Sequence, residues 1–130
     1  MSEIPGGLRY TEEHEYVRDT DVDGVVLIGI TDYAQGELGD VVYVELPQPG
    51  DTFDRMESFG TIEAVKAVSE LFCPVAGEVV EMNASLEDDP AAVNTDPYGE
   101  GWMIRVKVED PAQLDELLSP EEYRAHLGED

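Results

Sequence analysis

The sequence is poor in basic residues, and poorest in lysine. Its 130 residues hold 31 aspartates and glutamates against seven lysines and arginines, which gives a formal net charge of −24. This balance excludes nucleic acid and anionic membrane surfaces as partners, because both are bound through clustered lysine and arginine. Only two lysines occur, Lys66 and Lys107, so each position that keeps one deserves an explanation.

Cysteine and long apolar runs are also scarce. The single cysteine, Cys73, cannot form an internal disulfide, and its apolar neighbours predict a small core residue in a protein of a reducing compartment. No run approaches the roughly 18 apolar residues that span a bilayer. The N-terminus has neither the basic and apolar regions of a secretory signal nor the arginines of a transit peptide. We therefore expect a cytoplasmic protein.

The residues that are present predict one domain over 1–130, with a loose leader at 1–7 and a C-terminal helical segment at 111–127. The acids are spread along the whole chain. This spread favours an adaptation to high salt, where screening weakens the repulsion between them. The alternative is an acidic face for basic partner proteins.

Local patterns predict short strands and few helices. Apolar alternation and turn residues predict strands that begin at Tyr16 or cover 25–30, 40–46, 77–83 and 102–108. Capping residues predict a helix over 32–37 and a last helix from Ser119 to about His126, which packs Tyr123 and Leu127 on the body. Two short helical turns are expected at 85–87 and 90–93. In the last strand, Trp102 and its parity partners should face the core and Met103 should not.

No catalytic or metal-binding constellation is found. The run 19–24 matches the first half of an EF-hand loop, but Ile30 stands where a bidentate glutamate is needed. We predict an acidic hairpin turn there, with Gly24 in a left-handed conformation. The histidines, the cysteine and the carboxylates show no spacing typical of a metal site or a nucleophile–base pair.

One stretch, residues 60–77, has two β-prone runs on either side of Lys66. Apolar residues lie on both sides of the lysine, Ile62 and Val65 before it and Val68 and Leu71 after it. They predict two strands that are buried or half-buried. Lys66 itself must reach solvent, because burying an unpaired ammonium costs several kcal/mol. The stretch therefore predicts a hairpin with Lys66 exposed at its tip, whose second arm is ended by Pro74 and Gly77.

The segment from Glu63 to Phe72 resembles the lipoyl-attachment hairpin of the glycine cleavage system H-protein family almost residue for residue. Ala64 stands where that family usually has serine, and Phe72 and Cys73 stand where tyrosine and alanine are commoner. Biotin carriers have methionines beside the lysine, whereas here valine and alanine flank it, which favours lipoate. The resemblance covers about residues 8–127, and its other matching segments are 14–16, 30–46 and 94–102.

The resemblance implies a mainly β fold, a lipoyl/biotinyl-type barrel-sandwich hybrid with a short internal helix and a C-terminal helix. It implies a carrier protein that is not an enzyme and has no catalytic residue. Lipoate is expected on Lys66 as N6-lipoyllysine. Glu63, three residues earlier, is expected to help the lipoate-attaching enzyme to recognise the hairpin.

The implied function is that of a swinging arm. Lipoyl-Lys66 would shuttle the aminomethyl group from glycine decarboxylase to the aminomethyltransferase, and electrons to dihydrolipoamide dehydrogenase. These enzymes and the lipoate-attaching enzyme are the implied partners of a monomeric protein. Two alternatives stay open: an H-like carrier in lipoate relay or sulfur metabolism, and a β-sandwich interaction module whose turn lysine is never modified.

Overall fold

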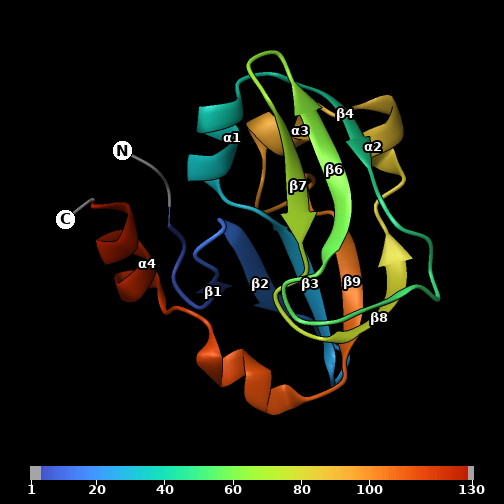
Figure 1. Cartoon of the computed structure of the whole chain (residues 1–130), viewed down its shortest axis with the longest axis vertical. Coiled ribbons are helices and arrows are strands. Elements are labelled where there is room, and N and C mark those ends of the chain that lie inside the picture. The colour runs from blue at the N-terminus through green and yellow to red at the C-terminus, as the bar shows by residue number, and fades with distance from the viewer. Residues whose placement is uncertain (1–3, 129–130) are drawn as a thin grey trace.

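Two β-sheets packed face to face form the body of the protein in a computed structural model that describes residues 4–128 (Figure 1). The larger sheet has, in spatial order, β1 (Arg9–Tyr10), β2 (Glu15–Asp19), β3 (Val25–Ile30), β9 (Ile104–Val108), β8 (Gly77–Met82) and β5 (Thr52–Phe53). The smaller sheet has β4 (Val41–Glu45), β6 (Ser58–Ala64) and β7 (Val68–Phe72). All neighbouring strands run antiparallel.

The main core lies between the two sheets. Ile28 and Val106 of the larger sheet share one buried cluster with Val44, Ile62 and Leu71 of the smaller one. Burying such a side chain contributes roughly 1.5–3 kcal/mol relative to leaving it exposed. Each sheet thus gives one face to the core, and the mainly β sandwich predicted from the sequence is confirmed.

Caps fix the helices close to their predicted places. Thr31 caps α1 (Asp32–Leu38) by accepting a hydrogen bond from the backbone N–H of Ala34, and Ser119 and Glu122 form a reciprocal capping box at the start of α4 (Pro120–Leu127). The remaining helical segments are α2 (Ser85–Asp88), α3 (Ala92–Thr95) and the 3-10 helix η1 (Pro111–Glu116). No helix within residues 4–128 has the length and apolarity to cross a membrane.

A second apolar cluster joins α4 to the start of the chain. The rings of Tyr10 and Tyr123 stack with centroids 4.7 Å apart, and Leu127 packs against the same cluster, as predicted. Ile4 also packs there, and the carbonyl of Pro5 accepts a hydrogen bond of 2.6 Å from the Tyr10 hydroxyl. The predicted loose leader is therefore in contact with the body from Ile4 onward; residues 1–3 lie outside the described residues.

The alternation predicted for 102–108 fails at its beginning. Met103 is fully buried in the main core, although it has the parity that was expected to face away, and Trp102 is only half-buried. The reason is that β9 starts at Ile104, so the two residues before it do not follow the pleat of the strand. Trp102 packs instead against the second cluster, with the Arg105 guanidinium over its ring at 5.2 Å.

Two glycines give opposite predictions for stability. A Cβ on Gly60 would collide with the carbonyl oxygen of Glu45, whereas a Cβ on Gly36 in α1 would meet open space. We expect Gly60→Ala to cost about 2–4 kcal/mol through overpacking. Gly36→Ala should gain up to about 1 kcal/mol, because alanine loses less backbone entropy in a helix. Urea unfolding followed by circular dichroism measures both; equal stabilities would contradict the packing described.

Candidate functional site

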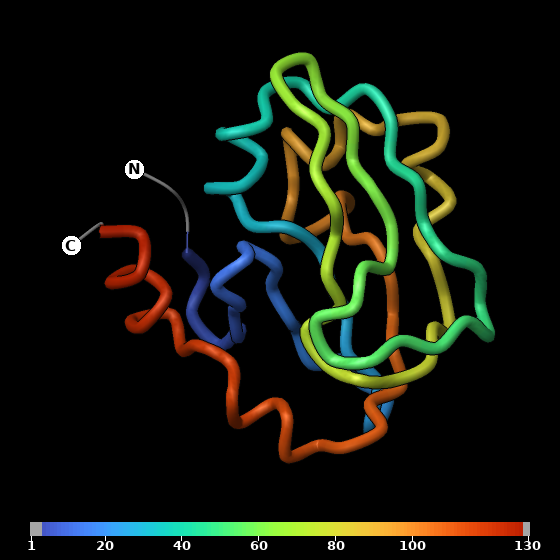
Figure 2. Tube along the Cα trace, viewed as in Figure 1, coloured from blue at the N-terminus to red at the C-terminus, as the bar shows by residue number. Residues whose placement is uncertain are grey.

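The predicted lysine lies at the tip of a β-hairpin. β6 and β7 pair with Glu63 opposite Val68, and the backbone N–H of Ala64 donates to the carbonyl of Ala67 at 2.8 Å. Residues 65–67 form the loop between the two strands, and Lys66 is exposed. Figure 2 shows this tip at the opposite end of the molecule from η1.

Hydrogen bonds hold the backbone of the tip in place, although the Lys66 side chain is exposed. The N–H of Val65 donates to the carbonyl of Asp40 at 2.9 Å, and the N–H of Lys66 donates to that of Leu38 at 3.3 Å. The Lys66 stem lies against Gly39, where an added Cβ would come within 3.2–3.3 Å of its Cγ, Cδ and Cε atoms. The connection between α1 and β4 thus supports the tip, and its glycine leaves room for the lysine stem.

Asn94, on α3, holds that connection in place. Its amide Nδ2 donates to the carbonyl of Gly39 at 2.8 Å and to the side chain of Gln35 at 2.9 Å. Its Oδ1 accepts from the N–H of Val41 at 2.8 Å. Sequence reasoning did not single out this residue, because its partners lie more than 50 positions away and no local pattern connects them.

The Lys66 amine has no ion-pair partner within residues 4–128, where the ion pairs found join arginines to acids. A charged amine that is neither buried nor paired can be reached without breaking a contact of the folded protein. The arrangement therefore offers a primary amine on a fixed base, which can be acylated and can carry the attached group away from the surface.

Glu63 is exposed on the outer face of the smaller sheet, between Tyr43 of β4 and Val68 of β7. The valines near it were expected to be buried or half-buried, and that expectation is wrong: Val65 is 72% exposed and Val68 is 67% exposed. Val65 lies in the loop, and Val68 lies on a face of the sheet that no other layer of residues 4–128 covers.

The end of the second arm agrees with the prediction for Pro74 and differs for Gly77. β7 stops at Phe72, before Pro74. Gly77 does not end the arm but starts β8, where a Cβ would collide with the carbonyl oxygen of Lys107. The close approach of β9 therefore explains this glycine better than a strand end does.

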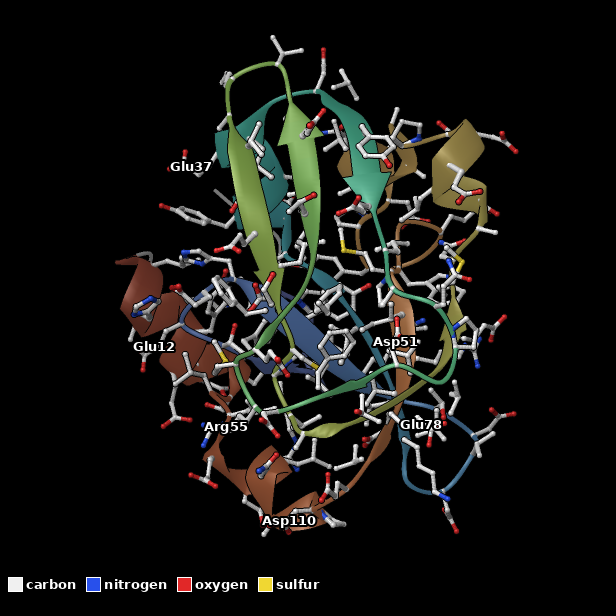
Figure 3. The ribbon with its side chains drawn as sticks, turned by 45° about the vertical axis from the view of Figure 1, so that its right-hand side comes forward. Glu12, Glu37, Asp51, Arg55, Glu78 and Asp110 are labelled. Atoms are coloured by element: carbon white, nitrogen blue, oxygen red, sulfur yellow. The ribbon has the colours of Figure 1, made fainter. Side chains whose placement is uncertain are left out.

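A cleft of about 260 Å³ opens between α1 and β7, next to the tip. Figure 3 shows Glu37, one of its residues, on α1 beside the hairpin. Carboxylates and apolar side chains line it together, among them Glu13, Glu37, Glu70, Ile30, Ile62 and Leu71. Leu38 is one of its lining residues, and the carbonyl of Leu38 accepts the hydrogen bond from the backbone N–H of Lys66, so the cleft lies close to the backbone of the tip.

Glu15 lies in the same cleft and is only 2% exposed. Burial raises the pKa of its carboxyl to about 8, although hydrogen bonds from the Thr11 hydroxyl at 2.7 Å and the Phe72 N–H at 3.4 Å oppose that shift. The carboxyl therefore keeps a proton at neutral pH. Sequence reasoning missed this residue, because an acid that starts a strand carries no sign of burial.

The remaining reactive side chains have structural roles. Cys73 is buried, as predicted, and burial raises the pKa of its thiol to about 12, which keeps the thiol protonated and unreactive. His14 is half-buried, with Nδ1 2.8 Å from the Tyr123 hydroxyl, and burial lowers its pKa. Within residues 4–128, no group of three or more His, Cys, Asp or Glu side chains could hold a metal ion.

Comparison with known proteins decides the family. The family model of the glycine cleavage H-protein matches residues 8–130. The chain belongs to this family. A glycine cleavage system H protein of Staphylococcus carnosus is 54% identical over 127 residues, which are 97% of this chain and 98% of that protein. Another of the same name, from Rubrobacter xylanophilus, is 55% identical over 132 residues, covering 100% of this chain and 99% of the relative.

A solved structure supports the same conclusion. The crystal structure of a glycine cleavage system H protein from Mycobacterium marinum has a TM-score of 0.88 and 42% identity, covering 96% of this chain and 99% of that one. The predicted barrel-sandwich fold and the resemblance to the H-protein family are confirmed. Members of this family are carrier subunits rather than catalysts, which confirms that the chain is not an enzyme.

The pKa of Glu15 predicts a measurable effect of pH. The folded state holds the Glu15 proton up to about pH 8, whereas the ordinary value is 4.5, so this carboxyl weakens folding as pH rises between these values. Glu15→Gln removes the effect, so the stability of the variant relative to the wild type should rise by about 4 kcal/mol from pH 5 to pH 8. Unfolding at several pH values measures this difference. The exposed Glu70→Gln is the control; if both variants follow the wild type in parallel, Glu15 is not the cause.

Proposed function

We propose that the protein carries lipoate on Lys66, as N6-lipoyllysine, and serves as the H protein of a glycine cleavage system in the cytoplasm. The observation that carries the proposal is made at the hairpin tip: hydrogen bonds hold the backbone of Lys66 in place, while its side chain is exposed. Family membership supplies the rest of the argument, because the relatives that match over nearly the full length have that name.

The residues around Lys66 fit such an attachment. The amine is exposed, Gly39 leaves space along its stem, and the tip is held by backbone hydrogen bonds that do not involve the side chain. Attachment takes an activated lipoyl donor, such as an acyl adenylate, from the lipoate-attaching enzyme. The amide bond to Nζ forms, the bond from the acyl carbon to the leaving adenylate breaks, and the amine gives up a proton.

Lipoate supplies a redox-active dithiolane at the end of a long flexible arm. The chain itself contributes the position of that arm, since tethering raises the local concentration of the cargo at each enzyme. The proposed partners are glycine decarboxylase, the aminomethyltransferase and dihydrolipoamide dehydrogenase. The carrier protein binds each of them as a monomer. The acidic cleft next to the tip suits the cargo, because an aminomethyl group is cationic and Glu13, Glu37 and Glu70 line the cleft.

The two lysines provide a direct test of the attachment site. Lys66→Arg should abolish lipoylation and keep the fold, because the guanidinium stays protonated and cannot form the amide. Lys107→Arg, at an exposed position on β9, is the matched control and should be modified like the wild type. Intact mass after incubation with lipoate, ATP and the lipoate-attaching enzyme gives the result. A lipoyl mass on the Lys66→Arg protein would disprove the assignment.

Reconstitution tests the metabolic role separately. The lipoylated protein, mixed with the three proposed partner enzymes, should support sustained glycine-dependent release of carbon dioxide, and the unmodified protein should not. Fully lipoylated protein that gives no turnover with enzymes active on another H protein would reject the glycine role. That outcome would favour the lipoate-relay alternative while leaving Lys66 as the attachment site.

A further inference from the structure

We infer that the outer face of the smaller sheet beside Lys66 is the docking surface for the enzyme that attaches lipoate. The surface, here called the tip patch, consists of Val42, Tyr43, Glu63, Val65 and Val68. The inference rests on the proposed function and deepens it, since it assigns the residues that the modifying enzyme reads. Attachment of lipoate to Lys66 does not by itself explain why the apolar residues of the patch are exposed.

The register of the strands places the patch on one face. Tyr43 of β4 lies opposite Glu63 of β6, which lies opposite Val68 of β7, so the three form one row across the sheet. Val42 lies where the register shifts between Val41 and Tyr43, and Val65 follows in the loop. The patch therefore reaches from β4 to the tip, with Glu63 between its apolar members Tyr43 and Val68.

The patch holds most of the exposed large apolar side chains of residues 4–128. Val42 is 56% exposed, Tyr43 49%, Val65 72% and Val68 67%, and together they are four of the six such side chains. The other two, Val22 and Val80, lie in the β2–β3 turn and on β8. Single exposed valines are normal on a protein surface, whereas three valines and a tyrosine gathered around one acid at one end of a sheet mark an interaction site.

The short reach of the lysine points to the attaching enzyme as the occupant. The Lys66 amine sits on a four-carbon stem that lies against Gly39, so an enzyme that acylates Nζ must bring its active site down to the tip. The surface next to the tip then contacts the enzyme. An enzyme that acts on the far end of the loaded arm can bind farther away, so it does not require this surface.

The carboxylates in and around the tip patch indicate the charge of the partner's surface. Asp40, Glu45 and Glu70 are exposed near the patch, and Glu63 lies within it. An apolar centre among carboxylates fits an enzyme face with an apolar pocket and a basic rim. A second copy of this chain is the poorer occupant, since acids would then face acids in a molecule of net charge −24.

The test compares lipoylation rates of unmodified proteins with lipoate, ATP and a purified lipoate-attaching enzyme, followed by intact mass. Tyr43→Thr should lower kcat/KM about tenfold and Val68→Thr about threefold, because each removes apolar contact from an interface centre. Val80→Thr makes the same change at a valine of the larger sheet and should stay within about 1.5-fold of the wild type. Threonine is β-branched and suits exposed strands, so all three should fold; thermal unfolding checks this.

The lipoylation rate of Glu63→Gln gives a second test, which does not depend on apolar packing. It should lower kcat/KM and make the rate less sensitive to ionic strength than the wild type, because it removes one charge that attracts the basic rim. Val42→Thr provides a second apolar variant should Tyr43→Thr fail to fold.

The outcomes separate the two proposals. A wild type that is not modified at Lys66 rejects the proposed function. A wild type that is modified, with Tyr43→Thr, Val42→Thr and Val68→Thr as fast as Val80→Thr, overturns the docking inference alone. So does a normal lipoylation rate combined with slow reconstituted glycine cleavage, which would assign the patch to a glycine cleavage enzyme. A dimer in sedimentation that Tyr43→Thr converts to monomer would assign it to a second copy.

Discussion

Two backbone hydrogen bonds, from Val65 to Asp40 and from Lys66 to Leu38, hold the hairpin tip against the connection between α1 and β4. Without them, the loop would depend only on the strand pairing below it, where β6 pairs with both β4 and β7 as far as Ala64 and Glu63. The backbone of the tip is fixed and the Lys66 side chain is unpaired in the described part of the chain. The conformational freedom at the tip is therefore confined to the side chain of this one lysine. An enzyme that binds this tip loses less conformational entropy than one that must first order a loop.

The support for the tip comes from parts of the chain that are far apart in sequence. Asn94 joins the carbonyl of Gly39 to α3, and the buried Val93 beside it belongs to the main core between the sheets. The position of Lys66 therefore depends on the packing of the whole sandwich, although its immediate neighbours are only a few loop residues. This dependence gives a physical reason for a carrier to have a folded domain behind a single reactive lysine.

The features that the sequence predicts correctly are local. The hairpin around Lys66, the capped starts of α1 and α4, and the left-handed Gly24 all follow from residues within one turn or one strand pair. The failures depend on tertiary contacts. Burial of Glu15 needs Thr11 and the N–H of Phe72 from another sheet, and exposure of Val68 needs a face that nothing covers. The cofactor itself followed only from the family resemblance, since a displayed lysine does not specify lipoate.

The charge of the protein bears on how its tip is recognised. Acids are exposed on many elements, as the labelled Glu12, Glu37, Asp51, Glu78 and Asp110 show (Figure 3). If this acidity is an adaptation to high salt, screening shortens the reach of every exposed carboxylate, Glu63 included. Many salts strengthen apolar burial as they weaken charge attraction. A recognition surface that combines Tyr43 and Val68 with a single acid then keeps its affinity where a purely acidic surface loses it. The apolar residues are therefore the part of the tip patch that such a solvent favours.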